Sequence, residues 1–122
     1  MAKRMTPEGY VLDAVLQYLA AKRIFAMRMN SGAIRLESQN GRTRYFKGHE
    51  AGTADVLALV KRFDYVTGDG SVLCDNLAVW IECKAPNGKQ SDNQRAFQEK
   101  VEAEGHEYIL AYGIDDLVAA GL

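Results

Sequence analysis

Two acids and a lysine in two apolar runs are the residue types that phosphodiester hydrolysis needs. Asp55 follows a glycine-containing loop in GTADVLALV, and Glu82 and Lys84 stand two residues apart in AVWIECKA. Because side chains along a strand alternate between its two faces, Glu82 and Lys84 would share one face with Trp80. The other face would carry the apolar residues Val79, Ile81 and Cys83. A second carboxylate beside Glu82 and Lys84 would complete a site for a divalent metal with a cation next to it.

The chemistry expected of such a site depends on Mg²⁺ or Mn²⁺. Magnesium takes few protein ligands and keeps several waters, so two carboxylates and one carbonyl would suffice. We expect Asp55 and Glu82 as the carboxylates and the backbone carbonyl of Cys83 as a third ligand. Lys84 would orient or deprotonate the attacking water, or stabilise negative charge in the transition state. As a base it would need a lowered pKa, which a nearby dication favours.

The Glu-x-Lys pattern alone is not specific, because a surface strand often carries both residues on one face. Two features of the sequence favour chemistry. The residues around Glu82 and Lys84 are strongly apolar, whereas a solvated face would carry more polar ones. Asp55 also interrupts an otherwise apolar strand directly after its loop.

Length and composition predict one soluble globular domain over residues 1–122. The chain is 48% hydrophobic and 25% charged, which is ordinary for a globular protein. It has no apolar run of about 18–20 residues and no apolar segment after its basic N-terminus, so we expect neither a membrane span nor a secretory signal. The expected location is the cytoplasm, where Cys74 and Cys83 would stay reduced.

The positive charge is concentrated in one segment. Residues 22–47 contain seven lysines and arginines and one acid, a net charge of +6. Since the whole chain carries −1, the rest carries −7. Such asymmetry is compatible with one face for a polyanion, and equally with ordinary solvated faces.

The first half of the chain predicts a helix and a basic antiparallel meander. Residues 7–22 have helical apolar spacing, with Thr6 as N-cap and Pro7 at the first helical position. Three strand-like runs follow at 24–30, 33–39 and 42–48, separated by turns that contain Asn and Gly.

The second half predicts alternating strands and helices. We expect a strand over 54–60, a turn at Gly68-Asp69-Gly70 within a segment that is hard to place (62–77), and a strand over 78–84. A helix from Ser91 to Glu104, ended by Gly105, precedes a strand over 106–112 and a short helix over 114–122. This order favours an α/β fold, with a mixed β-sheet flanked by helices.

Taken together, these pieces resemble the PD-(D/E)xK nuclease superfamily and, within it, the VRR-NUC (virus-type replication-repair nuclease) family. The resemblance covers nearly the whole chain, in the order and with the spacing of the family, and the small size is similar to stand-alone members encoded by phages. One departure is Ala54, which stands where the superfamily nominally has proline. The matching pieces are Glu8, the basic hairpin, GTADVL at 52–57, WIECK at 80–84 and GKQSDNQRAF at 88–97.

The resemblance implies a restriction-endonuclease-like core and roles for two more residues. Gln94 matches a glutamine near the active site, although Ser91 and Gln94 are also spaced as a capping box that merely starts a helix. Glu8 matches an acid of the first helix that reaches the metal through water, although an acid there also complements the helix dipole.

Five residues are candidates for DNA contact: Arg42, Arg44, Tyr45, Lys47 and Lys89. The first four would supply cations and one stacking ring from the hairpin, and Lys89 would touch a phosphate from the loop before the Gln94 helix. Each is also compatible with a routine exposed position.

We therefore expect a Mg²⁺- or Mn²⁺-dependent DNA endonuclease. The resemblance further implies branched substrates such as four-way (Holliday) junctions, action as a homodimer, and a phage or bacterial cytoplasmic setting. The alternatives are a catalytically silent DNA-binding module of the same fold, and a nuclease that acts on RNA or from DNA ends.

Overall fold

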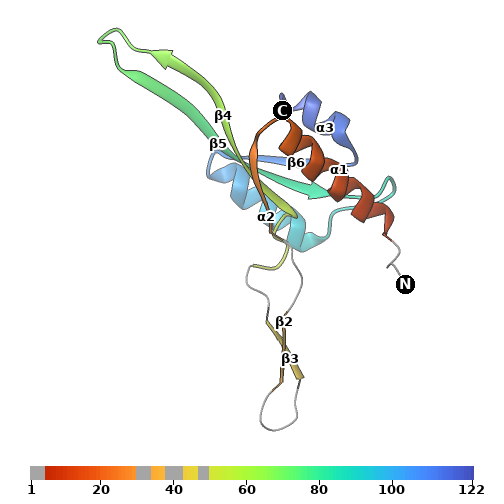
Figure 1. The fold of residues 1–122 in the computed structure, drawn as a ribbon. Coiled ribbons are helices and arrows are strands. Elements are labelled where there is room, and N and C mark those ends of the chain that lie inside the picture. The colour runs from red at the N-terminus through yellow and green to blue at the C-terminus, as the bar shows by residue number, and fades with distance from the viewer. Residues whose placement is uncertain (1–4, 30–33, 38–42, 47–49) are drawn as a thin grey trace.

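The structure, a computed structural model, describes residues 5–29, 34–37, 43–46 and 50–122 (Figure 1). Along the chain it contains α1 (Pro7–Ala21), β1 (Phe25–Arg28), β2 (Ile34–Glu37), β3 (Thr43–Phe46), β4 (Val56–Val66), β5 (Val72–Cys83), α2 (Asp92–Ala103), β6 (Glu107–Ala111) and α3 (Ile114–Ala119). Every element expected from the sequence is present, with some boundaries shifted. No helix in the described ranges has the length and apolar character needed to span a membrane.

One four-stranded sheet organises the body of the protein, in the order β1-β4-β5-β6. β4 runs antiparallel to both β1 and β5, whereas β6 runs parallel to β5. The sheet is therefore mixed, and helices lie on both sides of it (Figure 1). This confirms the expectation of a mixed sheet flanked by helices.

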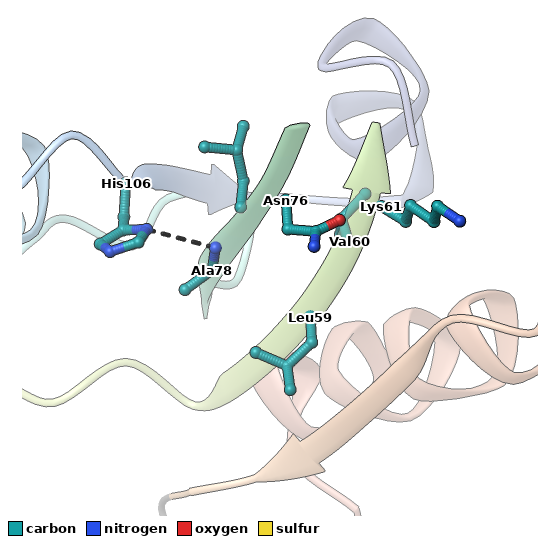
Figure 2. Close-up of a pocket in the computed structure, with 7 residues that line it drawn as sticks. Leu59, Val60, Lys61, Asn76, Ala78 and His106 are labelled. Atoms are coloured by element: carbon teal, nitrogen blue, oxygen red, sulfur yellow. Dashed lines mark hydrogen bonds between the residues drawn. The ribbon is translucent and has the colours of Figure 1, made fainter. Parts of the chain in front are cut away.

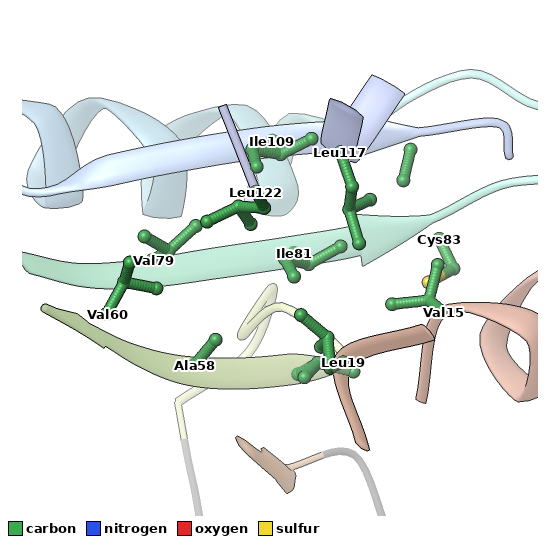
Figure 3. Packing of buried hydrophobic residues seen from close by; sticks show 12 residues of the cluster. Val15, Leu19, Ala58, Val60, Val79, Ile81, Cys83, Ile109, Leu117 and Leu122 are labelled. Carbon is green, nitrogen blue, oxygen red and sulfur yellow. The ribbon is translucent and has the colours of Figure 1, made fainter. Parts of the chain in front are cut away.

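The two faces of β5 separate as the alternation of its side chains predicts. Val79, Ile81 and Cys83 are fully buried in the core (Figure 3). Helices α1 and α3 cover this face with fully buried leucines and a valine: Val15, Leu19 and Leu117.

The opposite face of β5 carries Trp80 and Glu82 and is covered by α2. The ring of Phe97 on α2 meets Trp80 edge to face, with centroids 5.0 Å apart. Such an edge-to-face pair adds about 1 kcal/mol beyond the apolar area that it buries. Glu82 lies on this covered face of the sheet, beneath α2.

Both long helices begin as expected. The Oγ1 of Thr6 accepts a hydrogen bond of 3.0 Å from the Gly9 N–H, with Pro7 at the start of α1. At α2 the Ser91 side chain accepts from the Gln94 N–H, and the Gln94 side chain accepts from the Ser91 N–H, which completes a capping box.

The expected meander is wrong in one respect: β1 does not lie beside β2. It pairs with β4 in the main sheet, and β2 pairs with β3 in a separate two-stranded sheet (Figure 1). The reason is burial. Pairing β1 with β4 sets Ala26 beside the fully buried Ala58, against the core, which a local hairpin could not offer.

The segment that was hard to place forms a long hairpin. β4 and β5 pair from Val56–Ile81 out to Val66–Val72, across the turn expected at Gly68-Asp69-Gly70. Within the described parts of the chain, β1 pairs only with residues 56–59 and β6 only with 79–83. The remainder of the ladder projects as a two-stranded arm (Figure 1).

Candidate metal centre

Three carboxylates from three separate elements meet at one end of the main sheet. Glu8 lies in the first turn of α1, Asp55 directly before β4, and Glu82 next to the end of β5. One oxygen of each lies within 4.8 Å of the others. The expected pair of acids is therefore brought together, and Glu8 joins it.

The strand register places Asp55 beside Glu82. Val56 pairs with Ile81, so one step further the two acids stand opposite each other on the same face. Asp55 Oδ2 accepts a hydrogen bond of 2.8 Å from the Cys83 N–H, and the Asp55 carbonyl accepts one of 2.7 Å from the Met29 N–H. These bonds fix both the backbone and the carboxylate of Asp55.

Gly52 allows the loop before Asp55 to pack closely against the start of α2. Gly52 has φ +86°, and a Cβ at this position would lie 2.2 Å from the Asn93 carbonyl oxygen and 2.9 Å from the Gln94 nitrogen. Only glycine permits both the left-handed backbone and this approach. The loop that carries Asp55 and the helix that carries Gln94 are thereby held in contact.

We expect Gly52→Ala to destabilise the protein by about 2 kcal/mol or more, because the methyl group clashes with backbone and the positive φ is strained. Thermal or denaturant unfolding measures the change. Gly70→Ala is a matched control: it also has a φ of +86°, but its Cβ would meet nothing within 4 Å. Equal losses in both variants would show that strain alone, without the approach to α2, sets the cost.

Gln94 combines both roles that the sequence left open. Its Oε1 accepts the Ser91 N–H of the capping box at 2.9 Å, and its Nε2 donates to Glu82 Oε1 at 2.8 Å. The cap therefore orients the amide so that its donor points at the carboxylate. Gln94 contacts the centre through Glu82.

Glu82 is the most buried acid of the centre. Its side chain is buried, with 1% of the residue exposed, and its Oε2 has no hydrogen-bond partner among the described residues. Burial, followed by the charge of Asp55, raises the pKa of Glu82 to about 8, with a smaller increase from Glu8, while Lys84 acts in the opposite direction. An unpaired buried carboxylate oxygen is costly, and a bound cation would satisfy it.

Lys84 lies where the sequence placed it, on the face of Glu82. Its Nζ is 3.8 Å from Glu82 Oε1, and its side chain is 13% exposed. A Cβ at Gly88 would lie 3.2 Å from Lys84 Cβ and Cδ, so the following loop packs along the lysine stem. The ammonium is therefore held near the carboxylates.

Cys83 contributes its backbone rather than its thiol. The thiol is buried in the core, and burial with the nearby acids raises its pKa to about 12, which keeps it protonated. Its N–H holds Asp55, whereas metal binding by its carbonyl stays a prediction.

Three of the five candidate DNA contacts lie within the described residues. Lys89 is exposed in the loop before α2. Arg44 and Tyr45 lie on β3, and Arg42 and Lys47 lie outside the described residues. The DNA track therefore stays a prediction.

One residue near the centre was not singled out from the sequence. Arg28, the last residue of β1, lines a cavity of about 230 Å³ together with Glu8 and Asp55. In the sequence it is one of seven cations of the basic segment, and only the pairing of β1 with β4 brings it to the acids.

A larger cavity, of about 520 Å³, lies away from the carboxylates at the base of the arm (Figure 2). Its lining is mostly apolar and includes Leu59, Val60 and Leu77. His106 Nδ1 accepts a hydrogen bond of 3.3 Å from the Ala78 N–H at its edge. No acid is among the described residues that line it, so these residues offer no second metal centre.

The donors at the carboxylate centre suit a hard divalent cation. Carboxylate oxygens are the ligands that Mg²⁺ and Mn²⁺ prefer, and soft thiolate or imidazole donors are not among the three. Glu82 Oε2, which has no hydrogen-bond partner among the described residues, would serve as one ligand atom of such a cation.

Comparisons with protein-family models, with curated proteins and with solved structures gave no match for this chain.

Proposed function

We propose that the protein is a divalent-metal-dependent nuclease with a PD-(D/E)xK-type centre. The observation that supports this most directly is the group of three carboxylate oxygens within 4.8 Å, one of them on a buried acid with an unpaired oxygen. Lys84 beside Glu82 adds the cation that the Asp, Glu-x-Lys pattern requires.

Asp55 and Glu82 would hold Mg²⁺ or Mn²⁺ directly, with Glu8 beside them. A dication bound there would polarise a phosphate and lower the pKa of a water. Glu82 is held in place for this task by Gln94, and Asp55 by the Cys83 N–H. Both acid side chains are thus held in place before any ligand arrives, and electrostatic catalysis requires such preorganisation.

Lys84 would act on the attacking water or on the developing negative charge. Its amine lies on the same side as the carboxylates, and the packed stem limits where it can point. The N-terminus of α2, which carries Gln94, adds a partial positive charge near Glu82 that favours phosphate.

DNA as the substrate, endonucleolytic cleavage and a preference for four-way junctions rest on the resemblance to VRR-NUC nucleases. The net charge of +6 over residues 22–47 supports a polyanionic substrate. Arg35 and Arg44 of this segment lie on the two-stranded β2–β3 sheet, which projects from the body (Figure 1).

The proposal includes a homodimer, which would set two centres against two strands of a junction. An exposed apolar strip on β1 and β4 supports it: Phe25 is 64% exposed and its cross-strand neighbour Leu59 is 50% exposed. Sedimentation velocity at micromolar concentration measures the mass, and a monomer with and without DNA would refute the dimer.

A cleavage panel tests the proposed function. Linear, nicked, flap and four-way DNA are incubated with the protein and Mg²⁺, Mn²⁺ or EDTA, and metal-dependent cutting is expected, strongest on branched DNA. Binding without cutting would instead identify a silent DNA-binding module. Uncut closed circular DNA alongside degraded linear DNA would indicate an exonuclease, and cutting of RNA alone would change the substrate class.

We expect Lys84→Met to lower turnover by about a hundred- to ten-thousandfold, the usual contribution of a proton-transferring or charge-stabilising group. Methionine keeps the stem that packs on Gly88. Because Lys84 lowers the pKa of Glu82, its loss also favours protonated Glu82, so metal affinity should be compared above pH 9, where it should be largely kept. Lys22→Met, at the far end of α1, is the control, and a metal site lost at high pH would mean that Lys84 is structural.

A further inference from the structure

We propose that Arg28 and the cavity beside the carboxylates form a subsite for a nucleic-acid phosphate next to the one that is cleaved. This inference rests on the proposed function, because only that function defines a cleaved phosphate. It concerns how the substrate is held, and it assigns a role to a residue that the Asp, Glu-x-Lys pattern does not include.

The cavity is continuous with the carboxylate centre. Six of the described residues line it: Thr6, Glu8, Gly9, Leu12, Arg28 and Asp55. Two of the three acids of the centre belong to this lining, so a group in the cavity lies against the centre itself. A second hollow of about 200 Å³ shares Gly9, Leu12 and Arg28 and extends the depression along α1.

The pairing of β1 with β4 sets the direction of the Arg28 side chain. It pairs with Val56, whose side chain is buried in the core, so both point to the side of the sheet that α1 covers. The next residue, Met29, donates its N–H to the Asp55 carbonyl at 2.7 Å. The end of β1 is thus tied to the acid loop, and Arg28 faces the first turns of α1.

The charge of Arg28 is available to a ligand. Among the described residues its guanidinium makes no ion pair or hydrogen bond, although two acids line the same cavity. A guanidinium presents two parallel N–H donors that match two phosphate oxygens. Three carboxylates in close proximity repel a phosphate. The positive charge of Arg28 at their edge would offset this repulsion for the phosphate next to the cleaved one.

The position of Arg28 also gives the subsite a direction. Arg28 ends β1, and the β2–β3 sheet projects from the end of the main sheet at which β1 ends (Figure 1). A nucleic-acid backbone that leaves the centre over Arg28 would therefore continue toward the hairpin.

The test combines single-phosphate neutralisation with variants of Arg28. Binding of DNA in Mg²⁺ is measured in the Lys84→Met background, so that no cleavage is needed. The DNA series replaces one phosphate at a time by an uncharged methylphosphonate. Arg28→Gln removes the charge, Arg28→Lys keeps it without the fork, and Lys22→Gln is the control from the same basic segment.

With arginine at position 28 we expect neutralisation of one particular phosphate, adjacent to the cut, to weaken binding by about tenfold, the contribution of one charge-assisted contact. Arg28→Gln should weaken binding of unmodified DNA by about as much, with no further loss at that phosphate, and should reduce the salt slope by about 1. Arg28→Lys should recover part of the loss. DNAs with and without a terminal phosphate separate recognition of an end from recognition of an internal linkage.

Several results would overturn the subsite. The first is that Arg28→Gln binds unmodified DNA as tightly as the arginine protein does. The second is that the loss of DNA binding caused by Arg28→Gln adds to the loss caused by neutralisation at every phosphate. The third is that Arg28→Gln alters the Mg²⁺ affinity without any coupling to one particular phosphate. The last would mean that Arg28 only balances the charge of Glu8 and Asp55. If the wild-type protein cuts no DNA but the coupling appears, the nuclease proposal fails and the phosphate site stands. Cleavage without the coupling would refute the phosphate site and leave the nuclease proposal in place.

Discussion

Replacing Glu82 by glutamine is expected to lower metal-dependent cleavage by about a thousandfold or more. The amide keeps the size of the side chain and an oxygen that can accept from Gln94 Nε2, but it removes the charge that would hold the dication. The loss should appear in both turnover and Mg²⁺ affinity, measured by single-turnover cleavage and by calorimetry.

Glu99→Gln on α2 is the matched control, since that acid is exposed and lies outside the carboxylate cluster. The control should cleave as the wild type does. Glu82→Gln should also keep its fold, because neutralising a buried carboxylate removes a desolvation cost. A folded Glu82→Gln protein with full activity would contradict the assignment of Glu82 to the metal.

The metal-free protein is expected to lose stability as the pH rises from about 4.5 to about 8. Because the pKa of Glu82 is raised from 4.5 to about 8, the folded protein holds this proton more tightly than the unfolded chain does. The resulting stabilisation is fully present below pH 4.5. It is lost between pH 4.5 and pH 8, where the unfolded chain has released the proton that the folded protein still holds. At about 1.4 kcal/mol for each unit of pKa, the change amounts to a few kcal/mol. Urea denaturation in EDTA at a series of pH values measures it.

Two further measurements assign this pH dependence to Glu82. In Glu82→Gln the decline between pH 5 and pH 8 should largely disappear, since the amide does not titrate. Saturating Mg²⁺ should oppose the decline in the wild type, because metal binding and protonation compete for the same carboxylate. An equal decline in the glutamine variant would mean that other groups cause it.

Local sequence signals predicted the elements well because each depends on nearby residues. Thr6 with Pro7, Ser91 with Gln94, and Gly105 start or end helices through bonds within one turn, and the structure confirms all of them. The alternation of Val79, Ile81 and Cys83 with Trp80 and Glu82 likewise follows from the geometry of a single strand.

Pairings between distant segments were not predictable in the same way. The basic segment has three strand-like runs with turn residues between them, and local turn chemistry favours a meander. The structure instead pairs β1 with β4, because this covers Ala58 and closes the core beside α1. Arg28 reaches the acids only through that pairing, so no local signal could have identified it.

The sequence by itself therefore determined the chemical groups of the candidate centre and the faces on which Glu82 and Lys84 lie, because side-chain alternation is a property of one strand. It also determined that Gln94 would begin a helix. Only the tertiary structure decided that Glu8, Asp55 and Glu82 meet within 4.8 Å and that Gln94 turns its donor toward Glu82. Those distances depend on the register of β4 against β5 and on the contact of Gly52 with α2, and both are set by packing between segments far apart in the chain.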